Sequence, residues 1–232
     1  MNIPISCRLL ACCAFVRPGD RVADVGCDHG YLGIHLLTKG IASFVIASDI
    51  HRGPLNSAIQ NADKYGVADK MSFHLSDGLS SVPRNFDVLI CAGMGADTMI
   101  SILNQSPWLK SGSYRLILQC QSKISVLRRY LSETGWHIVR EVIQRDGRFL
   151  YTVMEVLFQN APLLSPGQWY IPPALLYTNS EDLPEYFYRV TEGLKKAVYL
   201  RKEQADPLQI AALQELETLD LPWLKEDNHD NR

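Results

Sequence analysis

The stretch Arg21-Val-Ala-Asp-Val-Gly-Cys-Asp-His-Gly30 decides the fold of this chain. Its first half predicts a short buried strand. Gly26 and Gly30 then predict a tight turn where backbone can approach a ligand, and the apolar residues near 30–39 predict a helix with free N–H groups at its start. A strand, a glycine-containing turn and a helix are the first unit of an open α/β sheet.

The alternation of strand and helix continues along the chain. Apolar runs predict further strands at 43–49, 70–76, 86–92 and 114–119, and helices at 5–16, 54–65, 96–105 and 123–134. Residues 136–144 and 148–158 predict two strands joined by a tight turn at Arg145-Asp146-Gly147. The predicted fold class is therefore α/β, a Rossmann-like, doubly wound, mostly parallel sheet that ends in an antiparallel hairpin.

The last third of the chain has a different pattern. Five prolines between 159 and 184 indicate a linker that wraps over a surface. Apolar residues with alternating spacings of four and three from Leu183 to Ala197 predict a packed helix, and Asp206-Pro207 predicts the start of another. We expect a catalytic domain at 1–158, a linker at 159–182 and a C-terminal helical hairpin at 183–232.

Length and composition exclude several classes of protein. The chain has 232 residues, 47% of them hydrophobic, and a net charge of -2, which together indicate a globular protein and no strongly basic nucleic-acid binder. The sequence predicts no membrane-spanning helix and no signal peptide. The six cysteines form no Cys-x-x-Cys pair and indicate a reduced, cytoplasmic protein without a metal site. We expect a monomer and leave the oligomeric state open.

Acidic residues follow three of the predicted strands. Asp24 lies two residues before Gly26, where a carboxylate repels a pyrophosphate and suits a cationic ligand such as S-adenosylmethionine (SAM). Asp49 ends the second strand, where an acid can accept the ribose hydroxyls of an adenosine, and Asp77-Gly78 follows the third. Each acid by itself is also explained as a turn or capping residue. All three at one sheet edge favour a ligand site.

A glycine-rich segment follows the fourth strand. Two glycines flank a methionine in Ala92-Gly-Met-Gly95, which lets a flat substrate approach closely. A loop that is glycine-rich for packing reasons is the alternative interpretation.

Together these residues resemble the bacterial tRNA (adenine(22)-N(1))-methyltransferase family of class I SAM-dependent methyltransferases. The resemblance runs over nearly the whole chain and includes the Pro-rich segment and the terminal helix pair. The matching motifs are Ile5-Ser-Cys-Arg-Leu9, Asp24-Val-Gly-Cys-Asp-His-Gly-Tyr-Leu32, Ala47-Ser-Asp-Ile50, Gly53-Pro54, Asp77-Gly-Leu79, Ala92-Gly-Met-Gly95 and Arg115-Leu-Ile-Leu-Gln119.

The resemblance implies methyl transfer from SAM to N1 of an adenine in the D-arm region of tRNA. The residues it implies for the cofactor are Asp24, Gly26, Cys27, Asp28, Gly30, Asp49, Ile50, Asp77, Gly78, Ala92 and Gly93. The residues expected at the RNA substrate are Arg8, Tyr31, Gly95, Gln119, Lys195 and Lys196. The residues expected to take part in catalysis are Asp28, His29 and Met94. Asp28 would accept from the exocyclic amine of the adenine, or it only contacts cofactor or caps the helix.

Two positions depart from the family pattern. The chain has Gln119-Cys120-Gln121 where the family commonly has Gln-Pro-Asn, and Cys7 where it commonly has lysine. Two alternatives therefore stay open: a SAM-dependent methyltransferase for another RNA or a small molecule, and an inactive relative that kept the fold.

The small net charge hides an uneven distribution. Residues 1–157 have a net charge of +3, the predicted helix at 185–202 also has +3, and residues 203–232 have -6. We expect RNA phosphates to meet this helix, the hairpin arginines and a helical surface with Lys123, Arg128 and Arg129. Solvated helix faces paired with one another are the alternative.

Overall fold

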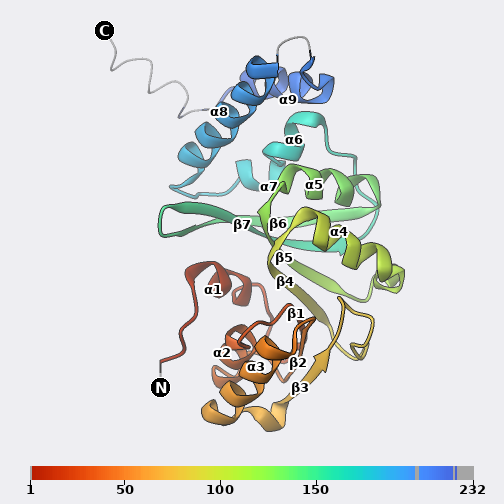
Figure 1. The fold of residues 1–232 in the computed structure, drawn as a ribbon. Coiled ribbons are helices and arrows are strands. Elements are labelled where there is room, and N and C mark those ends of the chain that lie inside the picture. The colour runs from red at the N-terminus through yellow and green to blue at the C-terminus, as the bar shows by residue number, and fades with distance from the viewer. Residues whose placement is uncertain (1, 202–203, 222, 224–232) are drawn as a thin grey trace.

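The computed structural model describes residues 2–201, 204–221 and 223 of the chain. Its centre is a seven-stranded sheet in the order β3-β2-β1-β4-β5-β7-β6 (Figure 1). The first five strands are parallel, whereas β7 is antiparallel to both β5 and β6. The strands are β1 (Arg21–Val25), β2 (Phe44–Asp49), β3 (Met71–Leu75), β4 (Val88–Gly95), β5 (Arg115–Ser122), β6 (Trp136–Asp146) and β7 (Phe149–Phe158). The predicted fold class is confirmed.

Helices cover both faces of the sheet because side chains alternate along the buried strands. On β4, Val88 and Ile90 belong to one apolar core and Leu89 and Cys91 to the other. The first core is covered by α1 (Cys7–Cys13), α2 (Tyr31–Thr38) and α3 (Arg52–Tyr65). The second is covered by α4 (Ala96–Gln105) and α5 (Ile124–Glu133). The short 3₁₀ helices are η1 (Ala68–Lys70) and η2 (Pro107–Ser111).

Two sheet segments differ from the prediction. The segment Ala92–Gly95 is the irregular end of β4, because β4 and β5 stay paired as far as Gly95 and Ser122 with register shifts around Met94. The turn of the hairpin is also shorter than expected. Asp146 already pairs with Phe149, so the loop is the two residues Gly147 and Arg148, and Gly147 has a φ of 60°.

The Pro-rich segment is packed and partly helical. It forms α6 (Pro166–Tyr170) and α7 (Pro173–Leu176), each with a proline in its first turn, and it buries Ile171 and Leu175. The helices α8 (Leu183–Arg201) and α9 (Pro207–Glu217) follow, and the side chain of Asp206 caps α9 by accepting from the N–H of Leu208 at 2.9 Å. Lys202 and much of the acidic end lie outside the described residues.

Arg128 corrects the prediction of an RNA-binding surface on α5. Its guanidinium is fully buried and pairs with the equally buried Glu141 of β6 at 2.6 Å. It also donates to the carbonyl oxygen of Tyr170 in α6 at 2.6 Å and to the hydroxyl of Tyr186 in α8 at 3.3 Å. Since a buried charge must be paired, Arg128 joins α5, β6, α6 and α8, and it is unavailable to RNA.

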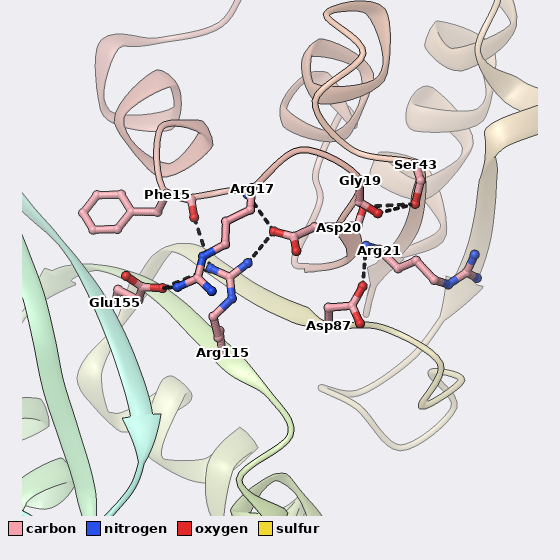
Figure 2. Close-up of polar contacts among 9 residues, drawn as sticks. All are labelled: Phe15, Arg17, Gly19, Asp20, Arg21, Ser43, Asp87, Arg115 and Glu155. Atoms are coloured by element: carbon pink, nitrogen blue, oxygen red, sulfur yellow. Dashed lines mark hydrogen bonds and ion pairs between the residues drawn. The ribbon is translucent and has the colours of Figure 1, made fainter.

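A second charged cluster holds the amino-terminal edge of the sheet together. Arg115 at the start of β5 pairs with Asp20 and, at 3.0 Å, with Glu155 of β7, and it donates to the carbonyl oxygen of Phe15 (Figure 2). The segment between α1 and β1 is thereby fixed against β5 and β7. The carboxyl ends of the parallel strands, at the opposite edge, are left to form a ligand site.

Candidate active site

The turn after β1 needs glycine at both predicted positions. Gly26 and Gly30 have φ values of 72° and 73°. A Cβ on Gly26 would lie 2.3 Å from Cε of Met94, and a Cβ on Gly30 would lie 2.9 Å from Cβ of Ala58. Asp28, at the tip, adopts a φ of 51°, a left-handed conformation that Asp tolerates better than most residues. The turn therefore brings backbone close to β4 and to α3.

Asp49 organises the same turn from the end of β2. One of its carboxylate oxygens accepts from the N–H of Asp28 at 3.2 Å, and the other accepts from the N–H of His51 at 2.9 Å. The side chain is nearly buried, so water screens its charge weakly and the charge acts strongly on neighbouring groups.

Asp24 lies in the interior beneath the turn. Its residue surface is only 3% exposed, and its Oδ2 has no hydrogen-bond partner among the described residues. Burial, together with the nearby carboxylate of Asp49, raises the pKa of Asp24 to about 7. A partnerless carboxylate of this kind favours a cationic group nearby, which would restore its ionised form.

A cavity of about 420 Å³ lies over the carboxyl ends of the strands. This volume is within the usual range for small-molecule sites. Ten of the predicted residues line the cavity: Arg8, Gly26, Asp28, Asp49, Ile50, Asp77, Gly78, Ala92, Gly93 and Met94. Since they come from α1, the turn after β1, the end of β2, the loop after β3 and β4, only the folded sheet brings them together.

Sequence reasoning missed several residues of this cavity. Thr98, Ser101 and Ile102 line it from α4, and their spacing of three and four residues is the only signal that the sequence offered. Ser76 also lines it and supports the Asp77-Gly78 turn, because its hydroxyl donates to the carbonyl oxygen of Gly78 and accepts from the N–H of Ser81.

Other predicted residues lie near the cavity without lining it. Asp24, Cys27 and Gly30 support the turn from behind, and burial raises the pKa of the Cys27 thiol, which keeps it neutral. His29 is half exposed, with its Nε2 3.6 Å from a carboxylate oxygen of Asp28 and its ring 5.9 Å from the ring of Tyr31. Lys195 and Lys196 lie on α8, away from the turn (Figure 1).

Gln119 supports the end of β4 from below. It is fully buried, and its Oε1 accepts from Nη1 of Arg8 and from the N–H of Gly93, both at 3.0 Å. Its burial leaves Arg8 and Gly93, and not Gln119 itself, to face the cavity. Gly95 also has a close neighbour, because a Cβ there would lie 2.8 Å from Oγ of Ser122.

The donor set fits SAM. Asp28, Asp49 and Asp77 line the cavity with Arg8 as the single lysine or arginine, so the charge suits a ligand with an ammonium and a sulfonium group. Asp49 lies where an acidic residue holds a ribose in folds of this type. Gly26 has no side chain, so the protein backbone of the turn can approach a ligand closely. The partnerless oxygen of Asp24 supplies one more acceptor beneath the turn.

The described residues hold no group of three or more His, Cys, Asp or Glu side chains that could bind a metal ion. In the same part of the chain, every helix is too short or too polar to cross a membrane.

Comparisons with known proteins relate the chain to methyltransferases. Residues 5–154 match the family model described as a methyltransferase domain. The tRNA (adenine(22)-N(1))-methyltransferase of Bacillus subtilis is 30% identical over 154 residues, which are 66% of this chain and 65% of that protein. A Mycoplasma pneumoniae protein named "Putative tRNA methyltransferase" is 33% identical over 71% of this chain and 77% of its own length. The aligned part of the chain spans 61% of a Mycoplasma genitalium relative.

Solved structures extend the similarity to the C-terminal helices. A Streptococcus pneumoniae protein described as "a putative tRNA (m1A22) methyltransferase, in complex with S-adenosyl-L-methionine" has a TM-score of 0.80 and 30% identity, and the match covers 91% of this chain and 99% of that one. A Streptococcus agalactiae protein of the NADB-Rossmann superfamily has a TM-score of 0.83 and 28% identity over 94% of this chain and 97% of that one. The chain belongs to the TrmK-like tRNA (adenine(22)-N(1))-methyltransferase family of class I methyltransferases, and its cofactor is SAM.

Proposed function

We propose that this protein transfers a methyl group from SAM to N1 of an adenine in tRNA, at position 22 in the D-arm region. One observation supports the proposal above all others: the acidic cavity suited to SAM continues to Gly93, Met94 and Arg8, where a flat base and its phosphate would meet it. The relatives named as tRNA methyltransferases for this position support the choice of tRNA and of N1.

The chemistry requires alignment and charge stabilisation more than a strong base. SAM, when bound, supplies an electrophilic methyl group that the lone pair of neutral adenine N1 can attack. The protein must hold N1 in line with that group and stabilise the positive charge that develops on the adenine. We assign this role to Asp28, because it lines the cavity and its side chain is 70% exposed. It would accept from the exocyclic amine, with His29 positioned beside it.

The end of β4 would form the wall on which the base rests. Met94 offers an apolar contact, and the N–H of Gly93 is fixed by Gln119, which also holds Arg8. Gln119 is a positioning residue in this scheme. A base within folded RNA must leave its stack to reach such a site.

The C-terminal helices would contact more distant parts of the tRNA. We keep 1–158 as the catalytic part, 159–182 as the connection and 183–232 as the tRNA-binding hairpin. Lys196 on α8 is exposed and has no ion pair among the described residues. The ammonium of Lys195 lies 3.3 Å from a carboxylate oxygen of Glu192 and 3.9 Å from one of Glu217. These two carboxylates weaken the attraction of Lys195 for a phosphate.

Mapping the methylated position in unmodified tRNA transcripts tests the proposal. We expect N1-methyladenine at position 22 with the wild-type protein. Asp28→Asn should lower kcat by roughly 10- to 100-fold, since asparagine keeps the left-handed backbone but loses the charge. SAM affinity should change by less than about fivefold, since the backbone of the turn is kept. Methylation of another base or of a small molecule would contradict the proposal, as would SAM binding without transfer to any tRNA.

A further inference from the structure

A second cavity, of about 320 Å³, lies next to the active site and has no part in the chemistry above. It is formed by the end of β5, the start of β7 and one face of α8. Figure 1 shows the tip of the β6–β7 hairpin between α1 and α8. The residues that matter for its use are Gln121, Lys123, Phe149, Tyr151 and Arg189.

Gln121 connects this cavity to the active site. It lines the second cavity, and its Nε2 lies 3.7 Å from the position that a Cβ on Gly93 would occupy. Gly93 lines the cofactor cavity from the other side. A chain of nucleotides whose target base lies at Gly93 would therefore place a neighbouring nucleotide over the second cavity.

Aromatic side chains form the outer wall of the cavity. Phe149 is 50% exposed, and its ring lies 6.0 Å from the ring of Tyr151. The guanidinium of Arg148 lies 5.0 Å from the centre of the Phe149 ring. An exposed aromatic ring with a cation on it is the arrangement on which unpaired bases stack.

The charge of the lining favours a nucleic acid over a cationic or a purely apolar partner. The lining contains Lys123 and Arg189 and no aspartate or glutamate. Lys123 forms an ion pair with Asp97 at 2.7 Å, and Arg189 forms an ion pair with Glu185. Arg148, next to the cavity, has no carboxylate partner among the described residues and is exposed to meet a phosphate.

We infer that this cavity binds an unpaired nucleotide adjacent to the target adenine, with its base stacked on Phe149. The inference rests on the proposed function, because it takes the substrate to be RNA. It assigns the β6–β7 hairpin a part in positioning the substrate.

Kinetics with a tRNA transcript test the inference. Phe149→Ala should raise KM for tRNA roughly 5- to 150-fold, the range that corresponds to the loss of one base stack. The value of kcat and the SAM affinity should stay within about twofold, since Phe149 does not line the cofactor cavity. Phe149→Trp should restore KM, and its added indole fluorescence should be quenched by tRNA.

Tyr177→Ala is the matched control, because Tyr177 is 87% exposed but lies outside this cavity. A Phe149→Ala variant that binds SAM and keeps the wild-type KM would overturn the inference, as would a Phe149→Trp variant without quenching. Direct measurement of tRNA binding by fluorescence anisotropy distinguishes failure of the stacking inference from failure of the proposed function. A wild-type protein that binds tRNA but methylates a different base refutes the proposed function, whereas equal tRNA affinity of wild type and Phe149→Ala refutes only the stacking site.

Discussion

Replacing Asp24 by asparagine should stabilise the SAM-free protein, and more so at high pH. The pKa of Asp24 rises from 3.8 to about 7 on folding. Between these values the folded chain keeps a proton that the unfolded chain has lost, so the wild type loses stability as pH rises. Asparagine does not titrate and escapes this loss.

The size of the effect follows from the shift. A change of about three pKa units corresponds to about 4 kcal/mol in total, at 1.36 kcal/mol per unit. Most of this free-energy difference develops between pH 5 and pH 8. Over that range the stability difference between Asp24→Asn and wild type should grow by about 3 kcal/mol.

Urea unfolding of both proteins at pH 5 and pH 8, without SAM, measures this difference. Asp63→Asn, at an exposed position on α3, is the matched control without burial. SAM titration at pH 8 gives a second readout: we expect roughly 10- to 100-fold weaker binding by Asp24→Asn, because the cationic ligand loses the attraction of a nearby buried negative charge. A stability difference that is equal at both pH values would refute the argument that burial suppresses the ionisation of Asp24.

Three further predictions concern other parts of the molecule. Arg128→Met should lower the unfolding free energy by about 3–5 kcal/mol in denaturant titrations, because Glu141 is left buried and unpaired, and adding Glu141→Leu should recover much of the loss. Gly26→Ala should weaken SAM binding in calorimetry at least about tenfold through its clash with Met94, whereas Gly40→Ala, with open space around it, should not; equal effects would contradict the close-approach argument. Lys196→Glu should weaken tRNA binding and flatten its salt dependence more than Lys195→Glu, and unchanged affinity of both at low salt would favour solvated helix faces.

The fold was predictable because its signals are local. Apolar strands of period two, helices that alternate with them and the glycines after β1 each need only neighbouring residues to be recognised. The positive φ values at Gly26 and Gly30 and the cap at Asp206 agree with that reasoning. The helices α6 and α7 were not predicted, because prolines in a short segment indicate a turn as readily as a first helical position.

The candidate site was predictable in part for the same reason. Acids at strand ends are visible in the sequence, and Asp28, Asp49 and Asp77 do line one cavity. Thr98 and Ser101 were missed because their residue types signal no chemistry. Gln119 was expected at the substrate, but its burial makes it a support for Arg8 and Gly93.

The sequence alone determined which elements form and which strand ends bear the acids, since both depend on residues close together in the chain. Only the tertiary structure decided how charges far apart in sequence are used. Arg128 and Lys196 look alike in the sequence, yet one is fully buried against Glu141 and the other is exposed on α8. The reason is physical: burial and pairing set the free energy and pKa of a charge, and both arise from contacts between distant segments.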